Sequence, residues 1–375
     1  MDFIIENIFV VLVLTIGMYV LFKLPQQIRF FFTKDKIDSE KLKKPYLECK
    51  YQKEYLNNII SIFKLVRLKN LIIVALTQLI IKFSLINPFL DNFILSNNQF
   101  YLLVLATIFI TASGYIINDI YDVKTDEVNN EESRIIGKSI TSRNAITWYI
   151  LFNLLGLGLG IFIAYIVKQP YFSIIFIYCI FSLWTYSKRM KTSFLLGNLQ
   201  VSLLTALSIF NVALFDIIPN GINENNGEMM IFKIILFYAA FAFIITFIRE
   251  MIKDLEDMEG DKKIQAKTLA ITYGIEKTKW VSLIFTIFTF LGITYFQYFQ
   301  YSIASSEFEY EISIWGVNKI AIIYAIFIQF LFLFLGFKIY ISKLKSDFYF
   351  ISQLCKIIMI VGILSIPLFT YLHLN

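Results

Sequence analysis

Long apolar runs separated by shorter polar stretches dominate the chain. Runs of about 20 residues match the roughly 30 Å hydrocarbon core of a bilayer at about 1.5 Å of helix rise per residue. The pattern therefore predicts an all-α, polytopic transmembrane helical bundle. Ten helices are expected, at residues 3–23, 68–86, 101–117, 146–167, 171–186, 194–215, 231–249, 278–298, 317–341 and 353–373.

The first run stands apart from the others, because the polar, Lys-rich stretch Lys34–Asn58 follows it. The chain begins Met-Asp-Phe-Ile-Ile-Glu, without the positive charge or the small-residue cleavage site of a secretory signal. We therefore interpret the first run as a retained membrane helix. The expected organisation is an N-terminal helix with a cytoplasmic linker over residues 1–56, followed by a nine-helix membrane domain over residues 57–375.

Composition supports a membrane protein and excludes a soluble one. The chain is 58% hydrophobic and only 17% charged, against about 25% charged in an average soluble protein. Its net charge of +6 fits an excess of Lys and Arg facing anionic lipid. We expect no nucleic-acid partner, because no basic patch carries stacking aromatics. The three scattered cysteines form no CxxC pair, and His373 lies almost at the C-terminus, so we expect no zinc site and no catalytic histidine.

The loops between the predicted helices alternate in positive charge. The stretches near 87–100, 216–230 and 299–316 contain no Lys or Arg. The turn near 168–170 contains only Lys168. The positive-inside rule places the stretches with two or more Lys or Arg in the cytoplasm, and these are 24–67, 118–145, 187–193, 250–277 and 342–352. We therefore expect an integral protein of the plasma (cytoplasmic) membrane with its polar loops on the cytoplasmic side.

An acidic motif begins where the third apolar run ends. Asn118, Asp122 and Asp126 are spaced i, i+4, i+8, and Asp119 lies three residues before Asp122. On a helix these side chains share one face, where carboxylates repel unless a cation lies among them. Hard oxygen ligands of this kind suit Mg²⁺, which takes one or two carboxylates together with substrate phosphate.

A second acidic motif follows the apolar run Phe232–Ile248. Asp254, Asp257 and Asp261 are spaced i, i+3, i+7, so a continuous helix would place them on one face. Arg249 and Lys253 lie within two turns before Asp257 and provide positive charge for a diphosphate. Either motif alone is typical of an ordinary charged loop. Two motifs at helix ends on the same side favour a shared metal site.

Two basic clusters are further candidates for the same site. Tyr186 and Lys191 belong to the segment Tyr-Ser-Lys-Arg-Met-Lys, and Arg67 opens the second apolar run. A membrane-interface anchor remains the alternative for both clusters.

At these residues the sequence resembles the UbiA-type intramembrane prenyltransferases, over roughly residues 57–373. The NDxxDxxxD and DxxxD motifs of that family correspond to Asn118–Asp126 and Asp257–Asp261, and its tyrosine–lysine element corresponds to Tyr186 through Lys191. The segments 117–137 and 249–269 most resemble the geranylgeranylglycerol-phosphate geranylgeranyltransferase branch. The chain departs from common residues of its relatives at Glu131, Gln265 and Ala270.

The resemblance implies Mg²⁺-dependent transfer of a prenyl group from a prenyl diphosphate to a lipophilic acceptor, most closely a prenylglycerol-phosphate type lipid. It implies a catalytic group of Asp122, Asp126, Asp257, Asp261 and Lys191. The implied diphosphate contacts are Arg67, Tyr186, Lys191, Arg249 and Lys253. The implied metal ligands are Asn118, Asp119, Asp122, Asp126, Asp254, Asp257 and Asp261. Membrane lipids surround the protein, and no obligate protein partner is expected.

Three other functions remain open from the sequence. An enzyme of a quinone pathway would prenylate an aromatic ring with the same motifs. A transporter would need ionisable residues near the bilayer midplane, where these segments carry almost none. A structural scaffold would bind no diphosphate.

Overall fold

The structure, a computed structural model, describes residues 60–90, 94–129, 134–221, 227–305 and 318–374. The predicted helix at 3–23 lies outside these residues, as do the side chains of 124–129, 220 and 299–305. The long helices of the described part are α3 (Leu68–Ile81), α4 (Asn97–Asn129), α5 (Ser142–Ile166), α6 (Ile174–Lys188), α7 (Leu196–Asp216), α8 (Gly227–Glu256), α10 (Leu269–Ser305), α12 (Lys319–Ile341) and α13 (Lys345–Leu374). The shorter helices are η1 (Lys82–Ile86), η3 (Pro170–Ser173), η4 (Met190–Thr192), η5 (Ile218–Asn220) and α9 (Met258–Lys263).

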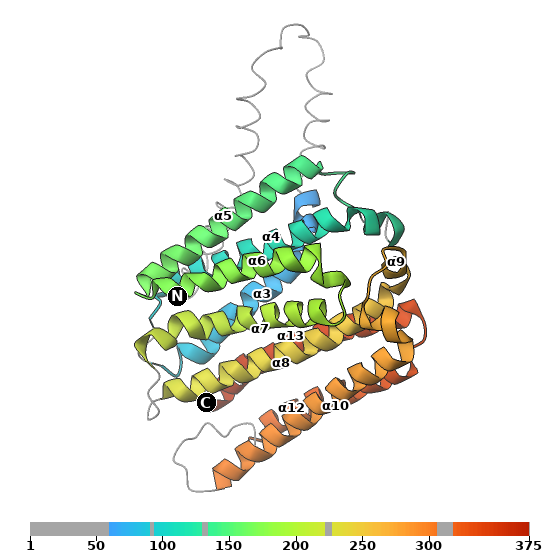
Figure 1. Ribbon diagram of the computed structural model, residues 1–375. Helices are drawn as coiled ribbons and strands as arrows, with labels where there is room; N and C mark the ends of the chain where they lie inside the picture. The colour runs from blue at the N-terminus through green and yellow to red at the C-terminus, as the bar shows by residue number, and fades with distance from the viewer. Residues whose placement is uncertain (1–59, 91–93, 130–133, 222–226, 306–317, 375) are drawn as a thin grey trace, which may run out of the picture.

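Within the described residues, nine helical segments are long and apolar enough to cross a membrane. They coincide with the nine runs predicted between residues 68 and 373, so the prediction of an all-α polytopic bundle is confirmed. The spans lie side by side, with α5 at one edge of the view and the α10–α12 pair at the other (Figure 1). In the centre, α8 packs against α7, α10 and α13, while α4 packs against α5 and α6.

The two acidic motifs have different local structures. Helix α4 runs on to Asn129, so the first motif is helical throughout. Helix α8 ends at Glu256, and Asp257 has φ −91° and ψ 3°, outside the helical range, before α9 begins. The second motif therefore turns a corner at Asp257, whereas its spacing predicts one continuous helical face. The corner directs α9 toward α4, against which it packs.

Candidate active site

The two acidic motifs lie at the same end of the bundle. Lys191, in η4, forms an ion pair with Asp122 of the first motif. Asn198, in the first turn of α7, donates a hydrogen bond of 2.8 Å from Nδ2 to Oδ2 of Asp254. Because η4 and the start of α7 are neighbours in the chain, these two contacts hold both motifs against one connecting segment.

The connecting segment between α6 and α7 needs a close backbone approach. Leu195 has a left-handed φ of 53°, and Gly197 follows it in the first turn of α7. A Cβ atom at Gly197 would lie 2.7 Å from the carbonyl oxygen of Met190 and 3.1 Å from Cα of Lys191. Glycine at this position therefore allows α7 to start directly against the turn that carries Lys191.

The first motif is also tied to the start of α3. Nη2 of Arg67 lies 3.1 Å from Oδ1 of Asp119, and the guanidinium carbon lies 4.9 Å from the ring centre of Tyr115. Nδ2 of Asn118 donates to Oδ2 of Asp122 over 2.6 Å. The polar face of α4 is thus fixed by partners from α3 and η4.

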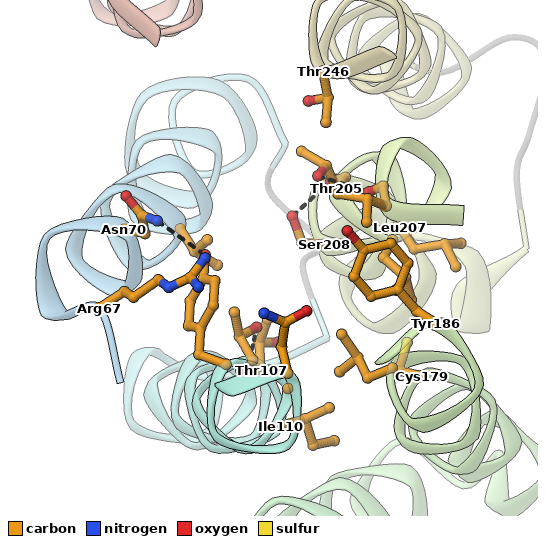
Figure 2. Close-up of a pocket in the computed structure, with 18 of the residues that line it drawn as sticks. Arg67, Asn70, Thr107, Ile110, Cys179, Tyr186, Thr205, Leu207, Ser208 and Thr246 are labelled. Atoms are coloured by element: carbon orange, nitrogen blue, oxygen red, sulfur yellow. Dashed lines mark hydrogen bonds between the residues drawn. The ribbon is translucent and has the colours of Figure 1, made fainter. Parts of the chain in front are cut away.

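A cavity of about 270 Å³ opens between these elements. Side chains from α3, α4, α6, α7 and α8 converge on it (Figure 2). At the end that bears the motifs its polar lining, here called the polar rim, is formed by Arg67, Asn118, Tyr186, Lys191, Arg249, Glu250 and Lys253. Its deeper lining is mostly apolar and includes Ile110, Phe176, Leu183, Leu204 and Leu207.

Cations outnumber carboxylates in the lining of this cavity. Arg249 forms an ion pair with the buried Glu250, which is the single carboxylate among the described lining residues. Lys253, one turn further along α8, and Lys356 of α13 add two positive charges. The cavity therefore presents an electropositive surface suited to an anionic ligand.

The second motif contributes a carboxylate, that of Asp261, which resists ionisation in the folded protein. Asp261 is 8% exposed. Its burial, together with the nearby charge of Asp257, raises the pKa of Asp261 from 3.8 to about 6, although Lys191 and Lys253 favour its charged form. A buried carboxylate that lies near a second carboxylate is typical of a site that a cation completes.

The donor chemistry of the two motifs fits Mg²⁺. Among the described residues no three His, Cys, Asp or Glu side chains already form a metal cluster. Mg²⁺ commonly uses one or two carboxylates and completes its shell with water and substrate phosphate. The carboxylates of Asp122, Asp254 and Asp261, with the amide of Asn118, supply oxygen ligands of this kind, and a cation would offset the burial of Asp261 near Asp257.

The structure brings most of the sequence-predicted residues into one region. Six of them line the cavity, namely Arg67, Asn118, Tyr186, Lys191, Arg249 and Lys253. Asp119, Asp122 and Asp254 contact cavity residues or α7 directly, and Asp261 lies within electrostatic range of Asp257, Asp122 and Lys191. The side chain of Asp126 lies outside the described part of the chain.

Two charged cavity residues were missed by the sequence analysis. Glu250 follows Arg249 directly, and its charge at the end of an apolar run was the signal available for it. Lys356 lies inside the last apolar run and belongs to neither motif. Its ionisable side chain within a membrane span could have indicated it.

The sequence of this chain is similar to sequences of one known protein family. Residues 89–306 match the UbiA prenyltransferase family. The digeranylgeranylglyceryl phosphate synthases of Sulfurisphaera tokodaii and Thermococcus sibiricus are each 33% identical to this chain, over 188 and 194 residues. The aligned parts cover 49% and 51% of this chain and 62% of each relative. The chain thus spans less than two thirds of the length of these curated relatives.

Solved structures share the fold at low sequence identity. A structure described as giving insights into digeranylgeranylglyceryl phosphate synthase in membranes has a TM-score of 0.57 at 22% identity, covering 84% of this chain and 98% of that one. The apo structure of a UbiA homolog from Aeropyrum pernix K1 has a TM-score of 0.54 at 13% identity, covering 81% and 97%. A UbiA homolog from Archaeoglobus fulgidus bound to GPP and Mg²⁺ has a TM-score of 0.50 at 16% identity, covering 82% and 99%.

The family match extends over more than half of the 375 residues, and the helical bundle matches structures of the same family. This chain belongs to the UbiA prenyltransferase family.

Proposed function

We propose that this protein transfers a prenyl group from a prenyl diphosphate to a lipophilic acceptor, a prenylglycerol-phosphate type lipid. The observation that carries the proposal is the meeting of both acidic motifs beside the polar rim of an otherwise apolar cavity. The relatives at 33% identity are named digeranylgeranylglyceryl phosphate synthases, and a homolog of the same fold was solved with GPP and Mg²⁺. Both facts support this choice of substrates.

In this proposal the acidic motifs hold Mg²⁺ and the diphosphate. The metal ligands are Asn118, Asp119, Asp122, Asp126, Asp254, Asp257 and Asp261, the residues named from the sequence. When bound, Mg²⁺ neutralises the charge that develops on the departing diphosphate.

The cations of the polar rim act on the same leaving group. Lys191 forms an ion pair with Asp122, and Lys253 directly precedes Asp254 in the sequence. In this position an ammonium group stabilises negative charge on a departing phosphate oxygen. Lys191 also holds Asp122 in place. Arg67 and Tyr186 complete the diphosphate surroundings, and Arg249 lies at their border with the rest of the cavity. The allylic C–O bond breaks, the acceptor hydroxyl attacks the allylic carbon, and its proton is lost.

The deeper, apolar part of the cavity houses the prenyl tail. Ile110, Phe176 and Leu204 offer the hydrocarbon surface that an isoprenoid chain requires. Filling this space also excludes water, which would otherwise capture the allylic cation.

We further propose that residues 57–375 form the prenyltransferase domain and residues 1–56 an N-terminal helix with its linker. The acidic motifs then face the cytoplasm, and the protein resides in the plasma membrane. The charge alternation of the loops supports this orientation.

The test is product formation by the purified protein. We expect a new lipid, heavier by one prenyl group, when geranylgeranyl diphosphate is supplied with geranylgeranylglyceryl phosphate and Mg²⁺. Chelation of the metal should abolish the product, as measured by mass spectrometry. If a product forms only with an aromatic acid as acceptor, the proposed lipid acceptor is wrong. If no product forms with any acceptor, the proposed prenyl transfer is wrong.

A further inference from the structure

A lysine that belongs to neither acidic motif faces the cavity from α13. Lys356 lines the cavity and is half-buried in a helix long enough to span the membrane. Among the described residues, no carboxylate forms an ion pair with it. An ionisable side chain at such a position is costly, and it is usually functional.

The charges around Lys356 are mostly of the same sign. Arg249, Lys253 and Arg67 lie within electrostatic range and repel it, while Glu250 attracts it more weakly. Glu250 is already paired with Arg249. Lys356 therefore adds to an uncompensated positive charge, which an anionic ligand would neutralise.

Arg249 presents a donor toward the same region. Its Nη1 donates to Glu250, whereas its Nε is buried and has no hydrogen-bond partner among the described residues. Nε and Nη2 form the edge of a guanidinium group that holds a phosphate or carboxylate with two parallel hydrogen bonds. An unpaired buried donor is costly unless a ligand accepts its hydrogen bond.

Arg249 and Lys356 line the cavity from the wall formed by α8 and α13. Arg249 precedes Asp254 by five residues and Asp257 by eight, which is about 7 Å and about 12 Å along a helix. Side chains on a helix tilt toward its N-terminus, and the N-terminus of α8 is the end remote from Asp257. The side chain of Arg249 therefore leans toward the deeper part of the cavity, away from the corner at Asp257.

We propose that Lys356 and the free edge of Arg249 bind the phosphate of the acceptor lipid. This inference rests on the proposed function, and it makes Lys356 a residue that determines acceptor specificity. The donor tail occupies the apolar wall from α4, α6 and α7, and the acceptor phosphate sits against the wall from α8 and α13. A phosphate monoester matches both features, because it takes two hydrogen bonds from Arg249 and carries the charge that offsets Lys356.

The test compares two acceptors that differ only in the phosphate. Purified wild-type, Lys356→Gln and Lys343→Gln proteins receive geranylgeranyl diphosphate with either geranylgeranylglyceryl phosphate or geranylgeranylglycerol. Lys343 is exposed and lies outside the cavity lining, so it is the matched control. We expect Lys356→Gln to lower the preference for the phosphorylated acceptor, measured as the ratio of kcat/KM values, by about tenfold or more, equivalent to about 1.4 kcal/mol. This loss should come from a higher KM for geranylgeranylglyceryl phosphate in Lys356→Gln. The Lys343→Gln control should keep the wild-type ratio of kcat/KM values.

A binding measurement separates this inference from the proposed function. Native mass spectrometry of the same proteins, without donor, reports occupancy by geranylgeranylglyceryl phosphate. Lower occupancy in Lys356→Gln than in the control supports the acceptor site even if no variant turns over. Equal occupancy in both proteins, or a kinetic loss confined to the KM of the diphosphate, overturns it.

Discussion

Breaking the ion pair between Lys82 and Asp216 by a single substitution should strongly destabilise this bundle. Both side chains are fully buried, and Nζ of Lys82 lies 2.6 Å from Oδ2 of Asp216. Nζ also donates to the carbonyl oxygen of Leu95 over 3.0 Å, while Oδ1 of Asp216 accepts from the backbone N–H of Leu95 over 2.8 Å. The pair thus joins η1, the end of α7 and the segment before α4.

Replacing one partner leaves the other charge buried without the opposite charge of this ion pair. Such single changes cost about 3–5 kcal/mol, whereas replacing both partners with apolar residues of similar volume is often neutral or stabilising. We therefore expect Asp216→Asn and Lys82→Met each to lower the unfolding temperature by roughly 6–10 °C, taking about 2 °C per kcal/mol for a large domain. The double variant Lys82→Met/Asp216→Leu should recover most of this loss.

Thermal unfolding in detergent, followed by tryptophan fluorescence at one fixed scan rate, measures the effect. The exposed Lys343→Met serves as the control for removal of a lysine charge and should shift the transition by less than 1 °C, because surface charges contribute little. The reasoning fails if either single variant lowers the transition by less than 2 °C. It also fails if the double variant unfolds at as low a temperature as the single ones.

Three further predictions concern the candidate active site. Asp122→Ala or Asp257→Ala should abolish prenyl transfer, assayed by radiolabelled donor, while each protein still inserts in the membrane and elutes as a folded species. Gly197→Ala should lower kcat about tenfold or more, because the new Cβ must displace the turn that carries Lys191; the same assay reports it. Asp261→Asn should raise the unfolding temperature at pH 7.5 with chelator present. Because its pKa is raised to about 6 in the folded protein, ionisation removes stability as pH rises from about 4 to about 6, by roughly 3 kcal/mol at most.

Each of these predictions has its own contrary result. Full activity of purified Asp122→Ala or Asp257→Ala would contradict the metal-ligand roles. For Gly197→Ala, the matched control is Gly292→Ala in α10, where an added Cβ meets no atom within 4 Å, and equal activity of the two variants would contradict the positioning argument. An Asp261→Asn protein that unfolds below wild type at pH 7.5, or keeps its advantage at pH 4, would show that burial does not penalise this carboxylate.

The membrane architecture could be predicted from sequence because apolar length is a local property. Each of the nine described spans contains a long, predominantly hydrophobic run, and the length of that run identifies it. The number of membrane spans between the two acidic motifs predicts that both motifs lie on the same side of the membrane. The contacts of Lys191 with Asp122 and of Asn198 with Asp254 are consistent with this prediction.

Contacts between distant segments could not be predicted in the same way. Lys82 and Asp216 are 134 residues apart, and each stands within or beside an apolar run where nothing local indicates its partner. The corner at Asp257 is similar, because the spacing of the motif is fully compatible with a continuous helix. Lys356 was overlooked for a related reason, since one lysine in an apolar run is compatible with a snorkelling side chain.

Under the proposed function, the inner end of the cavity has a consequence for the length of the prenyl donor. Along α4 the lining runs from Asn118 to Thr107, which is about 16 Å of helix. At this end of the cavity, the fully buried Gln78 donates hydrogen bonds to Thr107 and to the backbone of Ser208. These bonds join α3 to α4 and α7. An isoprenoid tail longer than this depth cannot continue straight between the helices. The tail would have to bend toward the surrounding lipid. The cavity would then contact only the first part of the prenyl chain, and the rest of the chain would lie in the bilayer.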